Sequence, residues 1–158
     1  MRINMRKFAR LGVVAGGLGL ALIAGTGGAQ AYTYDGSDPS STGCSSDAST
    51  VASAPMKTLL SGYHVGTIEM RYSLNCHTAW ARLTLDGPES ACGNASAGQA
   101  CSTASIVRNN DGRTYTCTIR QGQTQCYTPM VYDKGLTSYA RGVIDAASGV
   151  INVRTVSY

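Results

Sequence analysis

The chain has few of the residues that enzymes use most often. Its 158 residues are 14% charged and include two histidines and only two glutamates, Glu69 and Glu89. A glycosidase needs two carboxyl groups facing each other across a cleft, but Glu89 lies in a Pro-Glu-Ser turn and Glu69 alternates with polar residues. The nucleophile motif G-x-S-x-G is also missing. These shortages argue against hydrolysis, with a Ser–His–Asp group built on His64 or His77 as the alternative.

The sequence also has no C-x-x-C motif, so its six cysteines do not follow the spacing of zinc ligands. An even number of cysteines in an exported chain is typical of disulfide bonds. The spacing predicts one bridge across a polar loop, a second across a hairpin and a third by elimination. These bridges are Cys92–Cys101, Cys117–Cys126 and Cys44–Cys76, respectively.

The second bridge follows from strand geometry. Residues 113–120 and 123–132 are predicted strands on either side of Gln121 and Gly122. If these two residues form a two-residue turn, Cys117 and Cys126 face each other at a non-hydrogen-bonded position, where Cα atoms lie about 4.5 Å apart. That separation is near the short limit for a disulfide, so the bridge would join the two strands of one hairpin.

The first 31 residues have the three parts of a secretory signal peptide. Four basic residues precede an uncharged run over residues 11–24, and Ala29-Gln30-Ala31 matches a cleavage site. The run is shorter than the roughly 20 residues of a membrane-spanning helix, which disfavours the alternative of a retained anchor. We therefore expect residues 32–158 to be secreted, extracellular and free of the membrane after cleavage.

Cleavage would also remove the apparent positive charge. The net charge of +4 comes from 13 basic and 9 acidic residues, and four of the basic residues lie in the signal peptide. The remainder, residues 32–158, carries nine of each sign. The length of this region is typical of one domain. Because the region has no net charge, it lacks an electrostatic basis for binding nucleic acid.

Alternating side chains predict an all-β domain. Residues 65–72 place Ile68, Met70 and Tyr72 on one face, and residues 78–85 place aliphatic residues opposite Trp80 and Arg82. Such alternation is typical of half-buried strands. Further strands are expected at 104–108, 113–120, 123–132, 137–145 and 150–157. The chain should therefore form a small disulfide-bonded sandwich or barrel.

Three other segments are predicted separately. Residues 32–43, rich in serine, glycine and aspartate, are expected to form a short N-terminal arm. Residues 50–60 favour a short helix that Pro55 interrupts. A similarity between residues 70–82 and 130–141 suggests two pseudo-repeats of a three-strand unit, and chance similarity between hairpins is the alternative.

Aromatic and charged residues are the candidates for contact with a partner. Trp80 and Arg82 share one face of a strand, where a Trp–Arg stack serves either packing or an interface. The arm adds Tyr32, Tyr34 and Asp35. These five residues are the predicted partner-binding set.

The arm also contains a weak calcium pattern. Asp35 and Asp38 would suit a hard cation, but the other positions of an EF-hand loop are missing. An Asx turn at Asp38 is the alternative interpretation. We expect no metal site, no cofactor and no catalytic residue.

Several short motifs occupy the first half of the predicted domain: YDG at 34–36, DP at 38–39, TGC at 42–44, GTIEMRYS at 66–73, and TAWAR at 78–82 after Cys76. In this combination they resemble a family of small secreted proteins of unknown function from Gram-positive, mainly actinobacterial, bacteria. Some members are similar to the adaptor subunit of umbrella-shaped toxin particles, which joins a toxin stalk to lectin-bearing spokes. The resemblance implies an arm that enters the cleft of a trypsin-like partner domain, and it implies no catalytic residues.

These observations favour a non-catalytic secreted adaptor or binding protein, whose partners are other secreted proteins such as lectin-bearing or trypsin-like subunits. Two alternatives stay open. A protease inhibitor would present the arm, or the loop between Cys92 and Cys101, to a peptidase. A small cell-wall hydrolase would use His64 or His77.

Overall fold

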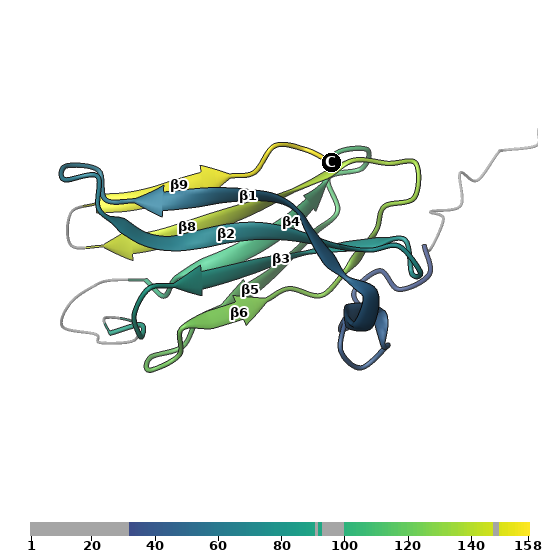
Figure 1. Cartoon of the computed structure of the whole chain (residues 1–158), viewed down its shortest axis with the longest axis horizontal. Helices are drawn as coiled ribbons and strands as arrows, with labels where there is room; N and C mark the ends of the chain where they lie inside the picture. The colour runs from purple at the N-terminus through teal and green to yellow at the C-terminus, as the bar shows by residue number, and fades with distance from the viewer. Residues whose placement is uncertain (1–31, 91, 93–99, 147–148) are drawn as a thin grey trace, which may run out of the picture. The chain divides into compact units, whose positions relative to one another are not determined.

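The protein is a sandwich of two antiparallel sheets (Figure 1). A computed structural model describes residues 32–90, 92, 100–146 and 149–158. The strands are β1 Ser49–Lys57, β2 His64–Ser73, β3 Thr78–Leu85, β4 Thr103–Arg108, β5 Thr114–Thr118, β6 Gln125–Tyr127, β7 Val131–Tyr132, β8 Ser138–Ala146 and β9 Gly149–Arg154. The first sheet has the order β1-β2-β3-β6 with β7 beside β3, and the second has the order β5-β4-β8-β9. The predicted all-β class is confirmed, with the sandwich as its architecture.

The core lies between the sheets, where β1 faces β9, β2 faces β8, and β3 faces β4 and β8. As the alternation predicts, Ile68, Met70 and Tyr72 of β2 are buried there, because successive side chains of a strand point to opposite faces. The neighbouring strand β3 and the second sheet contribute Ala79, Ala81, Leu83, Ala104, Ile106, Ala140, Ile144 and Ile151. Full burial of each large aliphatic side chain contributes about 1.5–3 kcal/mol, and this shared apolar layer holds the sheets together.

The segment predicted as a short helix is instead the edge strand β1. This strand pairs with β2, and Pro55 stands opposite Thr67. Proline has no amide hydrogen, but an edge strand needs ladder partners on one side only. Ala52 and Met56 are buried in the core, so packing against the second sheet decides the conformation of this segment.

The predicted hairpin over residues 113–132 is wrong. β5 pairs with β4 in the second sheet, whereas β6 pairs with β3 in the first. A turn does form at Gln121 and Gly122, because the amide of Gln123 donates a hydrogen bond to the carbonyl of Arg120 at 2.9 Å. The chain passes from one sheet to the other at this turn, which lets the inward residues of both strands reach the shared core.

All three predicted disulfide pairs are present: Cys44–Cys76, Cys92–Cys101 and Cys117–Cys126. The third has a different role from the one expected, because Cys117 lies opposite Ala104 of β4 and Cys126 lies opposite Leu83 of β3. Its Cα atoms are 6.0 Å apart, compared with about 4.5 Å for a pair within a hairpin. The bond therefore joins the two sheets across the sandwich.

The two similar sequence segments do not share a strand pairing. Residues 70–82 belong to β2 and β3, which pair with each other. Residues 130–141 belong to β7, which pairs with β3 in the first sheet, and to β8, which pairs with β4 in the second. The similarity therefore does not correspond to a repeated unit of this fold.

Two predicted segments lie outside the described residues: the signal peptide, residues 1–31, and most of the loop between Cys92 and Cys101. Within the described ranges, no helix has the length and apolar character needed to cross a membrane.

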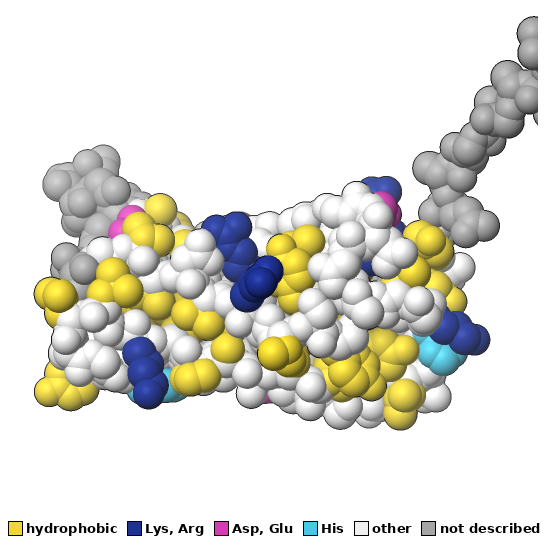
Figure 2. Space-filling view, turned by 90° about the horizontal axis from the view of Figure 1, so that it is seen from above, with side chains coloured by type: hydrophobic (Ala, Val, Ile, Leu, Met, Phe, Trp, Pro, Cys, Tyr) yellow, Lys and Arg dark blue, Asp and Glu magenta, His cyan; other side chains and the backbone are white. Residues whose placement is uncertain are grey.

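The surface of the sandwich is of mixed character. On the face shown in Figure 2, hydrophobic side chains form separate groups, and basic side chains stand among them. The most exposed hydrophobic residues include Leu59, Leu60 and Tyr63, all in the turn between β1 and β2. Basic side chains are more prominent than acidic ones on this face, although residues 32–158 carry equal numbers of both.

Candidate functional site

The N-terminal arm is folded onto the outer face of the first sheet. The amide of Gly36 donates to the carbonyl of Met130, and the amide of Met130 donates to the carbonyl of Ser37, both at 2.9 Å. A short 3-10 helix, Cys44–Asp47, follows the arm, and the disulfide between Cys44 and Cys76 fastens it to the turn between β2 and β3. The arm is thus a covering layer of the sandwich.

This layer encloses Trp80. The indole is 4% exposed and packs with Met130 and Cys44 in a second, smaller apolar cluster. The sequence pattern placed Trp80 and Arg82 correctly on the face opposite the core. That face is itself covered at Trp80, because the hydrogen bonds of the arm to Met130 hold the following residues over β3. Trp80 therefore serves mainly to pack the arm against the first sheet.

A shallow cavity of about 230 Å³ lies beside the covered indole. It crosses three strands of the first sheet and is bounded on one side by the arm. We call it the Arg82 groove. Its lining residues are Pro39, Ser40, Ser45, Arg71, Trp80, Arg82 and Tyr127.

Glu69 orients the arginine that gives the groove its name. Oε2 of Glu69 accepts a hydrogen bond from Nε of Arg82 at 2.7 Å, and Oε1 accepts one from the Thr50 hydroxyl at 2.9 Å. Burial raises the pKa of Glu69, but the hydrogen bonds from Arg82 and Thr50 outweigh burial and hold that pKa below its usual value. Glu69 is therefore ionised, and within the described part of the chain the terminal nitrogens of Arg82 have no hydrogen-bond partner.

A second guanidinium group lines the same groove. Nη1 of Arg71 donates to the Thr50 hydroxyl and Nη2 donates to the carbonyl of Ala48, each at 2.8 Å. In the pairing of β2 with β3, Arg71 stands opposite Trp80, and Glu69 stands opposite Arg82. Two cations and one carboxylate thus share this face, which makes the groove locally positive.

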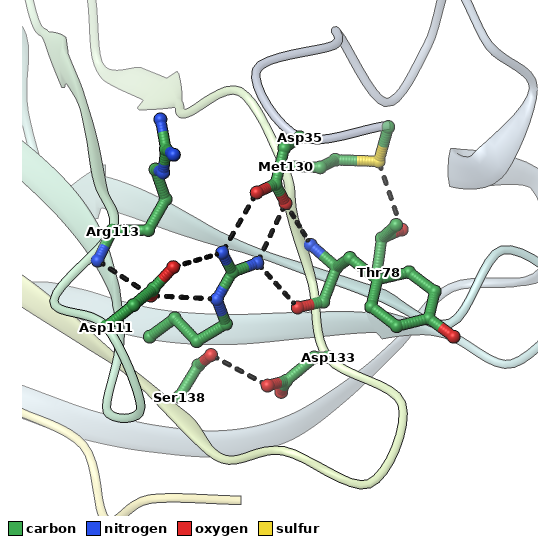
Figure 3. Close-up of polar contacts among 9 residues, drawn as sticks. Asp35, Thr78, Asp111, Arg113, Met130, Asp133 and Ser138 are labelled. Carbon is green, nitrogen blue, oxygen red and sulfur yellow. Dashed lines mark hydrogen bonds and ion pairs between the residues drawn. The ribbon is translucent and has the colours of Figure 1, made fainter. Parts of the chain in front are cut away.

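Two of the predicted partner-binding residues, Tyr32 and Asp35, lie elsewhere, around Arg108, and Figure 3 shows the contacts of Asp35. Arg108 is the last residue of β4, and its side chain is 1% exposed. Its Nη1 and Nη2 donate to the two oxygens of Asp35 at 2.9 and 3.0 Å, and Nε and Nη2 donate to Asp111 at 3.0 and 2.7 Å. Nη1 also donates to the carbonyl of Tyr132 at 3.0 Å, and the ring of Tyr32 lies 4.4 Å from the guanidinium carbon. We call these five residues the Arg108 cluster.

The Arg108 cluster explains where the arm begins its path over the sheet. Tyr32 also stacks on Tyr132, with 5.2 Å between the ring centroids. Hydrogen bonding to Arg108 lowers the pKa of Asp111 to about 2, so this carboxylate is ionised throughout the neutral range. The sequence does contain a signal for this cluster, because Arg108 follows Ala104 and Ile106 at an inward-facing position of its strand.

The remaining arm residues have separate surroundings. Tyr34 is 38% exposed and has a φ of 74°, in the left-handed region. Oδ1 of Asp38 accepts hydrogen bonds from the amides of Ser40 and Ser41 at 2.8 and 2.9 Å, which is the Asx-turn arrangement. The two carboxylates weighed as calcium ligands thus have different partners, since Asp35 binds Arg108.

The histidines occupy two unlike positions. Nδ1 of His64 lies 2.7 Å from Oδ2 of Asp86, and Nε2 lies 3.2 Å from the Thr67 hydroxyl. This order of hydroxyl, imidazole and carboxylate is that of a hydrolytic triad. The side chains of His64 and Asp86 are 42% and 52% exposed, however. Neither the Arg82 groove nor a second cavity along residues 122–127 is lined by them. His77 lies in the turn between β2 and β3, where its carbonyl accepts a hydrogen bond from the backbone amide of Asp133.

Comparison with known proteins identifies the family. Residues 32–141 match the family described as Protein of unknown function (DUF2690). The chain belongs to this family. It is also 34% identical over 138 residues to the uncharacterized protein YjfA of Bacillus subtilis (strain 168), and the alignment covers 82% of this chain and 83% of that protein. No solved structure matches the chain.

The family match confirms the predicted membership in a family of unknown function. It begins at Tyr32, the first residue after the predicted cleavage site. The three disulfides indicate an extracellular or otherwise oxidising environment. The roles of the Arg82 groove and of the Arg108 cluster must therefore be argued from their geometry.

Replacing Arg108 with methionine should lower the free energy of unfolding by about 3–5 kcal/mol, because two carboxylates lose their buried partner. Denaturation in guanidinium chloride with the disulfides intact measures this change. The matched control is Arg113→Met in the exposed turn between β4 and β5, which should change stability by less than about 0.5 kcal/mol. Equal losses in both variants would contradict the role assigned to the Arg108 cluster.

Next to the cluster, Asp133 is a buried carboxyl group with one unsatisfied oxygen. The residue is 4% exposed, and Oδ1 accepts a hydrogen bond from the Ser138 hydroxyl at 2.9 Å. Among the described residues, Oδ2 has no hydrogen-bond partner. Burial raises the pKa of Asp133 to about 6, although the Ser138 hydrogen bond and the charge of Arg108 act in the opposite direction.

Asp133 should make the protein less stable as pH rises from about 4 to about 6. The pKa of Asp133 is about 6 in the folded state and exceeds the usual 3.8. The carboxyl group of Asp133 therefore binds its proton more tightly in the folded state than in the unfolded state across that window. The cost of ionising it is on the order of 2–3 kcal/mol. Asp133→Asn should therefore gain stability relative to the unchanged protein between pH 4 and pH 7. Denaturation at four pH values tests this, and parallel pH profiles would show that Asp133 does not titrate as described.

Proposed function

We propose that the protein is a non-catalytic secreted adaptor that binds other secreted proteins, with the Arg82 groove as a contact surface. The observation that carries this proposal is the fixed arrangement of Arg71 and Arg82 on the outer face of the first sheet. Glu69 and Thr50 hold the two guanidinium groups, and the Cys44–Cys76 disulfide holds the covering arm. Side chains that are already ordered lose little conformational entropy on binding.

The size and lining of the groove favour a protein ligand over a small molecule. Its volume of about 230 Å³ is below the roughly 300–1,000 Å³ of most small-molecule sites, so it would accept one or two protruding side chains. Arginine and tyrosine are enriched among residues that dominate protein interfaces. Arg82 and Tyr127 both line the groove, and Tyr127 is 44% exposed.

An adaptor also needs a second surface, and the turn between β1 and β2 supplies a candidate. Leu59, Leu60 and Tyr63 in this turn are 62%, 89% and 73% exposed. A side chain built at Gly149 would approach Leu59 within 3.1 Å, so the first residue of β9 lies beside Leu59, and the next residue, Val150, is also exposed. Groups of exposed apolar residues often mark interaction sites.

The resemblance to toxin-particle adaptors provides the proposed partners, lectin-bearing or trypsin-like subunits. Insertion of the arm into a partner cleft would have to break the contacts of Tyr32 and Asp35 with Arg108. Contact through the Arg82 groove requires no such rearrangement. The groove is therefore the first surface to test.

Recovery of tagged protein from culture medium tests the adaptor proposal. The full chain, expressed in its own organism with a C-terminal tag, should co-purify with at least one other secreted protein. The double variant Arg82→Ala/Tyr127→Ala should recover about tenfold less of that partner. The control Arg141→Ala, on the outer face of the second sheet, should recover the usual amount. Isolation of the protein alone under every growth condition would count against an adaptor.

Hydrolysis is the second candidate function, and one observation favours it: the hydrogen-bonded series of Asp86, His64 and Thr67. Because this series is exposed and lies outside both cavities described above, we expect no hydrolysis of nitrophenyl esters or cell-wall polymers above the buffer rate. A measurable rate that disappears in His64→Ala and Thr67→Val, but persists in His77→Ala, would replace the adaptor proposal with an enzymatic one.

A further inference from the structure

We propose that the Arg82 groove recognises a carboxylate group of the partner protein, carried on a segment with a neighbouring apolar residue. This inference rests on the proposed binding function and specifies the chemistry of the ligand. The groove contains an oriented cation, the apolar surface of Tyr127 and the hydroxyl groups of two exposed serines, and each of these selects a different part of that ligand.

The cation is the terminal fork of Arg82. Its Nε is used by Glu69, and its terminal nitrogens have no partner in the part of the chain that the structure describes. A guanidinium group binds a carboxylate through parallel hydrogen bonds, and such charge-assisted bonds are stronger than neutral ones. Glu69 cannot supply these bonds itself, because its oxygens already accept from Arg82 Nε and from the Thr50 hydroxyl.

The other carboxylates nearby also have partners of their own. Asp38 accepts hydrogen bonds from two amides of the arm. Asp47 accepts from the Ser73 hydroxyl at 2.6 Å and from the amide of Asn75 at 2.8 Å. Neither residue lines the groove. An incoming carboxylate would therefore meet two guanidinium groups, those of Arg71 and Arg82, and a single carboxylate that is already neutralised.

The walls favour a polypeptide over a free anion. Tyr127, which is 44% exposed, supplies most of the apolar surface beside the cation and would contact the residue adjacent to the acid, whereas Pro39 and Trp80 are buried at the base of the groove. The hydroxyls of Ser40 and Ser45 also line the groove, and both residues are exposed. A simple anion would use the cation alone, whereas a segment pairing an acidic with an apolar side chain would use all three parts.

Nuclear magnetic resonance titration with two short peptides tests the inference. The probes are N-acetyl-Leu-Glu-Leu-amide and its uncharged match N-acetyl-Leu-Gln-Leu-amide. The chain has one tryptophan, so its indole N–H signal reports on the groove without ambiguity. The glutamate peptide should shift the Trp80 signal in a saturable way, and the glutamine peptide should bind about tenfold more weakly. Added salt should weaken binding of the glutamate peptide.

Matched variants locate the effect. Arg82→Gln should abolish the difference between the peptides, and Arg82→Lys should bind the glutamate peptide about tenfold more weakly, because lysine keeps the charge and loses the fork. Arg141→Gln is the control, since Nε of Arg141 also holds a hydrogen bond, to Asn152, on the second sheet. Equal binding of both peptides, no shift with either, or an unchanged difference in Arg82→Gln would overturn the inference. Sodium acetate binding as tightly as the glutamate peptide would overturn the apolar part of it.

The outcome can be separated from that of the adaptor proposal. If the partner recovered from culture medium still binds Arg82→Gln but is lost in Tyr127→Ala, the groove binds its partner without a carboxylate. In that case the adaptor function stands and this inference fails. If the glutamate peptide binds as expected and no secreted partner is ever recovered, the carboxylate site stands and the adaptor function fails.

Discussion

The buried guanidinium group of Arg108 is the constraint on which the outer part of the structure depends. A charge with 1% exposure is tolerated only when carboxylates and carbonyls satisfy it, and Asp35, Asp111 and Tyr132 do so. Because Asp35 belongs to the arm, the arm must start beside β4 and continue over the first sheet. That path covers Trp80 and places Pro39, Ser40 and Ser45 at the edge of the Arg82 groove.

Different parts of the structure provide its rigidity and its polar surface groups. The sheets are joined by a buried apolar layer and by the Cys117–Cys126 bond, and the covering arm is joined by Cys44–Cys76. On the outer face of the first sheet, Glu69 and Arg82 form an ion pair, and among the described residues the terminal nitrogens of Arg82 have no hydrogen-bond partner. The group around His64, which resembles a catalytic triad, is instead open to solvent. Preorganised charge of this kind supports the proposed binding function.

Membership in a family of unknown function does not assign a role to any residue. The Bacillus subtilis relative is itself uncharacterized, and the contacts of this chain are what support the proposed binding. Those contacts change the meaning of the predicted partner-binding set. Tyr32 and Asp35 hold the arm in place, whereas Trp80 and Arg82 form the groove that the arm completes. The arm and the groove therefore form one structural unit.

The sequence by itself determined the all-β class, the inward faces of β2 and β3, and the Cys92–Cys101 bridge across a short loop. These depend on alternation and spacing along a short stretch of chain, which neighbouring residues set. The sequence also predicted the Cys117–Cys126 pair, but through a hairpin that does not form. Tertiary structure alone decided that residues 49–57 form an edge strand, that the chain changes sheets near Gly122, and that Arg108 meets Asp35 across 73 residues. Such outcomes depend on which distant surfaces can be buried together, and local pattern carries little information about that.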